Sequence, residues 1–248
     1  MQVKFILAMT LSLFVFSSNA ALFEVTGDGA DRAPGENGWN KNWVGEPYLR
    51  VGRDYDDDFY SMVYVFELPE LPDGEFVDTA GLSFYVHDIN HFGSQHLDGK
   101  GIDLYGVRMA SSAGVELDDF FSGSFAATGN NGVGIQESIV FTNTGQPDHT
   151  GTGWHQTDPT GSANLGSWLQ GLYDDPGYNP AGDNFAFLRL SDQGNITTSG
   201  RFWEVRTANA GSSSVPVLTI ETAIPEPASV SLLALAGLSL FRRLRRHC

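Results

Sequence analysis

The densest group of potential metal ligands is a run of carboxylates in the segment RDYDDDFY. It places four aspartates within five positions, directly before a predicted strand: Asp54, Asp56, Asp57 and Asp58. Calcium takes six to eight oxygen ligands, and closely spaced carboxylates with nearby backbone carbonyls can supply them from one loop. The glycine and glutamate spacing of an EF-hand is absent from this run. The run therefore predicts either a calcium site or a solvated acidic turn.

A second group of candidate ligands lies in the segment VHDINHFGSQHLDG, which contains His87, Asp88, His91, His96 and Asp98. Imidazole and carboxylate groups could hold zinc or another transition metal. The four-residue spacing of the first two histidines suits a helix, whereas this segment has the pattern of a strand that runs into a glycine-containing loop. A metal site and an exposed polar loop therefore stand as alternatives.

Aromatic residues in loop-like segments supply a third kind of chemistry, stacking on sugar rings. The candidates are Trp39, Trp43, Trp154, Tyr173 and Tyr178. A flat exposed ring can cover the apolar face of a pyranose. A β-protein also uses such rings to fill its core or close its ends, so each candidate has this second interpretation. Trp168 and Trp203 lie in predicted regular elements, and we expect them in the core.

Compact catalytic motifs are missing from the sequence. There is no nucleophile elbow, no HExxH zinc motif and no phosphate-binding loop, and the single cysteine is Cys248. Neighbouring carboxylates such as Asp118 with Asp119, or Asp174 with Asp175, are expected by chance in a chain with 30 acidic residues. We therefore predict no enzymatic activity. A carbohydrate-active enzyme, a polysaccharide lyase or hydrolase, remains the alternative by fold analogy.

Short alternating segments predict the strands that must position these residues. Apolar residues alternate in 61–68 and 81–86, and shorter pairs continue the pattern at Ile102 with Leu104, Phe185 with Phe187, and Leu218 with Ile220. This spacing is typical of half-buried antiparallel strands. Helical spacing occurs in 162–173, where one stripe contains Leu165, Trp168, Leu169 and Leu172. The segment 21–223 is therefore predicted to be all-β, a single antiparallel β-sandwich of jelly-roll type with one short helix.

Both ends of the chain have the composition of export signals. Residues 1–20 carry Lys4, an apolar run from 5 to 16, and small residues before a predicted cut between Ala20 and Ala21, as in a secretory signal peptide. At the other end, residues 228–241 are mostly apolar and uncharged. Four arginines follow, Arg242, Arg243, Arg245 and Arg246, and they would hold that end on the cytoplasmic side. Fourteen helical residues reach about 21 Å, which makes a marginal membrane span.

The tail at 224–248 resembles the PEP-CTERM sorting signal of bacterial envelope proteins. The resemblance rests on Pro225, Glu226 and Pro227, the short apolar helix and the terminal arginines. It implies recognition by exosortase, a membrane protease-transpeptidase that processes the tail at the Pro-Glu-Pro region. It also implies transient residence in the inner membrane of a Gram-negative-type bacterium, followed by transfer to the cell surface or extracellular matrix. An ordinary tail anchor that is never removed is the alternative.

Removal of both ends would leave a strongly acidic domain. The chain has 14 basic and 30 acidic residues; without Lys4, the four tail arginines and Glu226, 9 basic and 29 acidic residues remain, a net charge of −20. Such a surface repels nucleic acid and anionic lipid, so we predict no nucleic-acid partner. Neutral glycans and divalent cations remain compatible with it.

The segment between the two ends is similar to DNRLRE-type domains, a family of secreted β-sandwiches. The matching motifs are Leu49-Arg50-Val51-Gly52, Leu71-Pro72-Asp73-Gly74, Ala80-Gly81-Leu82 and Pro216-Val217-Leu218. Some members of that family are carbohydrate-binding modules. Together these resemblances imply an exported, non-catalytic module of the envelope or extracellular matrix that contacts exopolysaccharide, with calcium as a candidate ligand. A purely structural biofilm or matrix protein is a further alternative.

Overall fold

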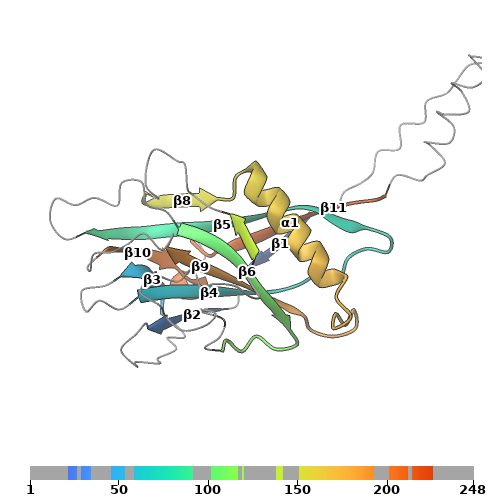
Figure 1. The fold of residues 1–248 in the computed structure, drawn as a ribbon, viewed down its shortest axis with the longest axis horizontal. Coiled ribbons are helices and arrows are strands. Elements are labelled where there is room, and N and C mark those ends of the chain that lie inside the picture. The colour runs from blue at the N-terminus through green and yellow to red at the C-terminus, as the bar shows by residue number, and fades with distance from the viewer. Residues whose placement is uncertain are drawn as a thin grey trace, which may run out of the picture.

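In the part of the chain that the computed structural model describes, a curled antiparallel β-sheet is accompanied by one α-helix (Figure 1). The structure describes residues 22–26, 29–34, 46–53, 59–91, 102–116, 119, 138–141, 151–192, 201–211 and 214–225. The β-rich prediction is confirmed. Among these residues no helix is both long and apolar enough to cross a membrane. The predicted signal at 1–20 and the apolar tail segment at 228–241 lie outside them.

Eleven strands form the sheet, and every pairing between them is antiparallel. The order along the sheet is β1-β11-β5-β10-β3-β4-β9-β6-β7, with β2 paired to β4 and β8 paired to β5. The strands are β1 (Leu22–Thr26), β2 (Gly29–Pro34), β3 (Tyr48–Arg53), β4 (Phe59–Glu67), β5 (Phe76–His91), β6 (Ile102–Ala110), β7 (Ser138–Phe141), β8 (Gly153–Gln156), β9 (Phe185–Asp192), β10 (Arg201–Arg206) and β11 (Val217–Ala223). The helix α1 spans Pro159–Tyr173, and η2 (Ala208–Ala210) is one turn of 3₁₀ helix.

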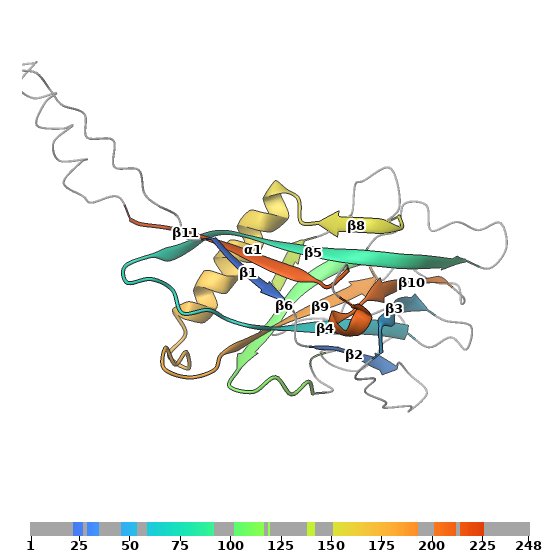
Figure 2. The same ribbon diagram turned by 180° about the vertical axis from the view of Figure 1, so that it is seen from behind.

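The long strand β5 joins two parts of the sheet. Ser83 pairs with Val217 of β11 and with Gln156 of β8, whereas Val86 pairs with Val205 of β10 and again with β8. A residue has one partner on each edge, so β11 and β10 follow one another along the same edge of β5, and β8 lies on the other edge. Figure 2 shows β1, β11 and β5 side by side on one part of the sheet. This division of one edge between two strands lets the sheet curl.

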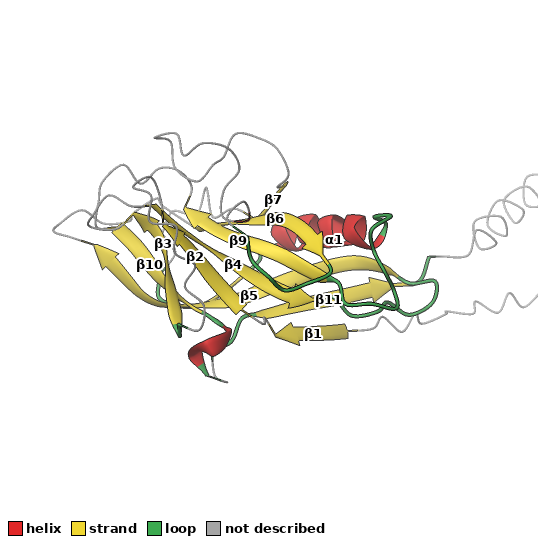
Figure 3. Cartoon of the chain, turned by 90° about the horizontal axis from the view of Figure 1, so that it is seen from below, coloured by secondary structure: helices red, strands yellow, loops and turns green. Residues whose placement is uncertain are grey.

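The helix α1 continues along the edge of β5 where β8 ends. Asp158 caps the helix by accepting a hydrogen bond from the backbone N–H of Gly161 at 2.6 Å. The side chain of Gln170 accepts a hydrogen bond from the backbone N–H of Val77 at 2.7 Å, so the helix satisfies a donor that the strand edge would otherwise expose. On another side of the helix, the ring of Trp168 packs directly against the backbone of Gly106 in β6. The predicted helix at 162–173 is confirmed, with three further residues at its start (Figure 3).

Two apolar clusters form the core. The main cluster gathers inward side chains of β3, β4, β5, β6, β9, β10 and β11 with Leu165 and Leu169 of α1. The second lies on the opposite face of β4, β6 and β9 and contains Val63, Val65, Val107, Phe185 and Phe187. The prediction of half-buried strands is therefore wrong for β4, which is buried on both faces because Met62, Tyr64 and Phe66 pack in the main cluster while Val63 and Val65 pack in the second. Trp203 is fully buried and Trp168 packs against the main cluster, as predicted.

Candidate functional site

Four residues lie at neighbouring levels of the strands β8, β5, β10 and β3, which follow one another in that order (Figure 1). Trp154 in β8 is the direct partner of Tyr85 in β5. Arg206 in β10 is the direct partner of Tyr48 in β3. Val86 of β5 pairs with Val205 of β10, and extending this register by one residue would put Arg206 at the level of Tyr85. We call Trp154, Tyr85, Arg206 and Tyr48 the aromatic row.

The alternation of side chains along β5 places the row on the outer face of the sheet, away from the main core. Phe84 and Val86 are buried in the main core, so Tyr85 between them points to the opposite face. The pairing then skips one residue, from Val205 with Val86 to Glu204 with Asp88. This bulge leaves both His87 and Asp88 exposed beside the row, before Ile89 packs against the core again.

The row and His87 form two groups of contacts: Trp154 with Tyr85, and Tyr48 with His87 and Arg206. The ring of Trp154 meets that of Tyr85 edge to face, with centroids 5.6 Å apart and an interplanar angle of 79°. At the other end the rings of Tyr48 and His87 are 5.4 Å apart. Arg206 Nη2 lies 3.0 Å from His87 Nδ1, and the guanidinium carbon lies 5.9 Å from the centroid of Tyr48. Because arginine can only donate, Nδ1 of His87 accepts this hydrogen bond.

Exposure sets the two end residues of the row apart from other large apolar side chains. Trp154 is 52 % exposed and Tyr48 is 41 % exposed. Among the described residues the third large hydrophobic side chain in the exposed class is Ile224, just after β11. The same sheet buries Trp203 and Phe202 completely, so the two exposed rings are the available aromatic surface among its described Trp and Tyr side chains.

Charges of both signs lie near the row. Arg50 Nε and Glu204 Oε1 lie 3.9 Å apart on the neighbouring strands β3 and β10. Asp88 accepts a hydrogen bond from the backbone N–H of Ile89 at 2.8 Å. Glu46 is exposed two residues before Tyr48. With Arg206, these described charges are two positive and three negative, so they show no excess of positive charge.

Tyr173 and Tyr178 lie elsewhere, at the far end of α1 from β8. Their ring centroids are 5.0 Å apart, and the hydroxyl of Tyr173 donates to the carbonyl of Pro69 at 2.8 Å. Burial raises the pKa of Tyr173 and, less strongly, that of Tyr178. Fifteen helical residues, about 22 Å, separate the start of α1 from Tyr173, so the structure does not bring this pair together with Trp154. The contacts of Tyr173 are those of a residue that holds the turn after the helix.

Most of the other predicted site residues lie outside the described residues. These are Ala20, Ala21, Trp39, Trp43, Asp54, Asp56, Asp57, Asp58, Glu226, Pro227, Arg242, Arg243, Arg245 and Arg246. Pro225 is described and exposed, two residues after the end of β11. Of the histidine cluster, His87 and Asp88 are described with their side chains, and within the described part of the chain no three metal-ligating side chains come together.

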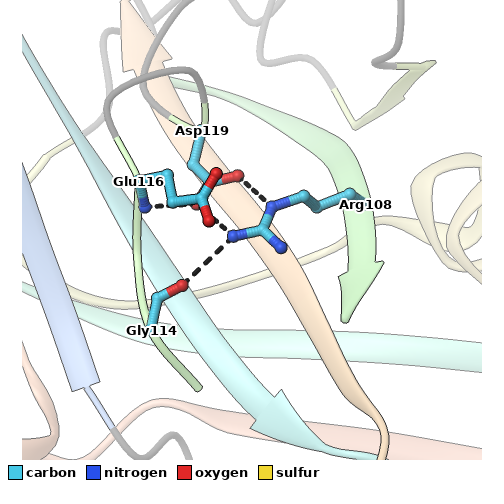
Figure 4. Close-up of polar contacts among 4 residues, drawn as sticks. All are labelled: Arg108, Gly114, Glu116 and Asp119. Atoms are coloured by element: carbon cyan, nitrogen blue, oxygen red, sulfur yellow. Dashed lines mark hydrogen bonds and ion pairs between the residues drawn. The ribbon is translucent and has the colours of Figure 1, made fainter. Parts of the chain in front are cut away.

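A second polar cluster, centred on Arg108 in β6, has a structural role (Figure 4). Both oxygens of Asp119 accept hydrogen bonds from the guanidinium of Arg108, whose Nη2 also donates to the carbonyl of Gly114 at 3.1 Å. The backbone N–H of Glu116 donates to the same carboxylate at 2.8 Å. Hydrogen bonding to Asp119 raises the pKa of Arg108, and its guanidinium covers the ring of Phe187 at 4.0 Å. These contacts fasten Gly114, Glu116 and Asp119 beside the second apolar cluster, which contains Phe187.

Sequence reasoning identified Trp154 but missed its partners in the row. It assigned Trp154 to a loop, whereas the structure has it in the strand β8. The alternation of the sequence could have placed Tyr48 and Tyr85 on the outer face of the sheet, because each follows or precedes an inward apolar residue. No protein-family model and no curated protein sequence matches the chain.

Proposed function

We propose that the protein is an exported, surface-sorted module that binds exopolysaccharide without cleaving it. The aromatic row is the observation that carries this proposal. Exposed rings at Trp154 and Tyr48 supply flat apolar surfaces for the faces of sugar rings. Arg206 and His87 between them supply polar groups for sugar hydroxyls.

A binding role fits the row better than a catalytic role. The row lies on the outer face of paired strands, and its titratable members are spread along the sheet. The two carboxylates beside it, Asp88 and Glu204, are each already engaged, one with a backbone N–H and one with Arg50. Glycoside cleavage needs two carboxyl groups that face one scissile bond from opposite sides. We therefore keep a carbohydrate-active enzyme as an outcome of the test below.

The fold proposed for this module is a β-sandwich of jelly-roll type. Support comes from the position of β5, which pairs with β11 along its first half and with β10 along its second half. Two parts of one curled sheet that share a strand can face one another across a core, and the main apolar cluster draws residues from both parts.

The sorting part of the proposal concerns the two ends of the domain. We infer that the signal at 1–20 is removed and that an exosortase-type membrane protease processes the tail at Pro225, Glu226 and Pro227. The pairing of Leu22 with Glu221 supports this, because it brings the residues next to both predicted processing sites to the same end of the β1–β11 pair. The mature protein then belongs to the cell surface or extracellular matrix. Calcium, held by Asp54, Asp56, Asp57 and Asp58, is a candidate second ligand on the sequence alone.

The test is affinity electrophoresis of the exported protein, recovered from the producing cells, in native gels that contain one polysaccharide each. The panel includes hydroxyethylcellulose, xylan, glucomannan, laminarin, dextran and the polyanion alginate. We expect a neutral polysaccharide to retard the protein, and we expect Trp154→Ala to remove most of the retardation. Ile224→Ala is the matched control, because it also removes an exposed apolar side chain but lies away from the row.

Each other outcome changes the proposal in a defined way. Uniform mobility on every gel would overturn glycan binding and favour a purely structural matrix protein. Shortening of the polysaccharide during the run would favour the enzyme. Equal mobility with millimolar calcium and with a chelator would remove calcium from the proposal.

A further inference from the structure

The aromatic row has a defined direction and length. Trp154 pairs with Tyr85 and Arg206 pairs with Tyr48, and the pair Val86 with Val205 links the two one residue away, so the row runs across the strands. Three steps between neighbouring strands, at about 4.8 Å each, separate Trp154 from Tyr48 by about 14 Å. A single sugar ring cannot reach both end rings at this distance, whereas a short extended oligosaccharide can.

The chemistry of the row changes from its ends to its middle. The ends are Trp154 and Tyr48, the two exposed Trp and Tyr side chains in the described part of the chain. The middle is Arg206, whose guanidinium is held on one side by His87 and lies near the ring of Tyr48. Such a surface matches a chain whose terminal contacts are ring faces and whose central contacts are hydroxyl groups.

The electrostatics favour an uncharged chain. The described charges near the row, Arg50 and Arg206 against Glu46, Asp88 and Glu204, offer no excess of positive charge to a polyanion. The net charge of −20 in the segment 21–223, which is 9 basic against 29 acidic residues, would also repel a polyanion over distances near the Debye length.

We propose that one extended, neutral glycan chain lies across the strands from Trp154 to Tyr48 and that both end rings bind the same chain. This inference rests on the proposed glycan binding and adds to it a ligand class, an orientation and a minimum length. Tyr48 then has the same role as Trp154, although the two residues lie 106 positions apart in the sequence.

The test is isothermal titration of the full exported protein with oligosaccharides of increasing length, prepared from the polysaccharide that retards it. We expect affinity to rise with each added sugar until the chain spans both rings, and to stay constant for longer chains. Trp154→Ala and Tyr48→Ala should each lower affinity for the long chains by about tenfold or more. Each variant should also reach its constant affinity at a shorter chain length, because one end contact is gone.

Three controls keep this inference separate from the proposed function. Ile224→Ala should bind as the unchanged protein does, and unchanged melting temperatures should show that both row variants fold, since the replaced side chains are largely exposed. If the protein binds the polysaccharide but Tyr48→Ala leaves affinity unchanged, or affinity does not depend on length, the spanning chain is wrong and glycan binding stands. If no glycan binds the unchanged protein, both proposals fail together.

Discussion

Tyr64 connects the core to the outer row through its hydroxyl. Its ring is fully buried in β4, and the hydroxyl donates to the backbone carbonyl of Arg206 at 2.7 Å. A buried tyrosinate is costly, so desolvation raises the pKa of Tyr64 well above the ordinary value of 10.0. The residue therefore holds the backbone of Arg206 while the side chain of Arg206 stays on the outside.

Alkaline pH should weaken the fold through this residue. Below pH 10.0 the hydroxyl is protonated in both states; above it the unfolded chain releases the proton while the folded chain keeps it. The contribution of Tyr64 to the free energy of unfolding is therefore constant below pH 10.0 and falls as the pH rises above it. Urea unfolding between pH 8 and pH 11 should show this decline. Tyr64→Phe should flatten it, at a cost of about 1 kcal/mol from the lost hydrogen bond.

A matched variant tests the cause. Burial also raises the pKa of Tyr173, so Tyr173→Phe should flatten the decline in the same direction. A Tyr64→Phe protein that loses stability with pH as steeply as the unchanged protein would contradict the role of the buried hydroxyl.

At the scale of elements, α1 depends on one glycine for its position against β5. A Cβ built on Gly166 would lie 2.9 Å from the Cα of Thr79 and 3.0 Å from the carbonyl oxygen of Asp78. Both are backbone atoms of a paired strand, so they cannot move aside without disturbing the sheet. The helix can approach the strand this closely because residue 166 has no side chain.

Gly166→Ala should therefore destabilise the protein by about 1–3 kcal/mol, although alanine is the better helix former. Gly171 provides the control in the same helix, because it is exposed and a Cβ there would meet nothing within 4 Å. Gly171→Ala should stabilise by about 0.5–1 kcal/mol through helix propensity. Denaturant unfolding of the two variants measures both effects. If both variants changed the free energy of unfolding in the same direction, the close approach of helix and strand would not explain the glycine at position 166.

The elements differ in how far the sequence could predict them. The alternation in 61–68 and 81–86 and the helical stripe ending at Tyr173 are local patterns, and the structure confirms them. The strand β8 was missed because its four residues include a glycine and are too short to show a period. The strand that ends in the segment VHDINH was predicted, although the bulge at His87 breaks its alternation; the start of β5 before residue 81 was not.

The row was beyond sequence reasoning for a different reason. Its members come from four strands whose neighbourhood depends on the whole topology, and no local pattern links Tyr48 to Arg206 or Trp154 to Tyr85. Single aromatic residues could be proposed as candidates, but their common direction required the pairing of the strands.

At the scale of the whole molecule, the exit of the tail is the feature that bears on sorting. The strand β11 ends at Ala223, and Pro225 is exposed two residues later. A protease can reach an exposed segment next to a finished strand without unfolding the domain. Replacement of Pro225, Glu226 and Pro227 by alanine should therefore leave the chain uncut in the inner-membrane fraction. Cell fractionation with intact-mass measurement detects both the location and the uncut tail.

The control for this prediction is again Ile224→Ala, which changes the neighbouring exposed residue but keeps the Pro-Glu-Pro sequence. It should be processed and released as the unchanged protein is. Equal mass and equal distribution of the triple variant and the unchanged protein would argue for an ordinary tail anchor.

The shared strand β5 also has a mechanical consequence. Its first half pairs with β11, whose far end leads to the tail, and its second half carries Tyr85 and His87 at the row. A pull along β5 from the row, opposed by a hold on the end of β11 at Ala223, would shear the two strands past one another along their own axes. Force in this direction stretches the hydrogen bonds between the two antiparallel strands together and not one after another. The β5–β11 pair would then resist tension applied along its strands.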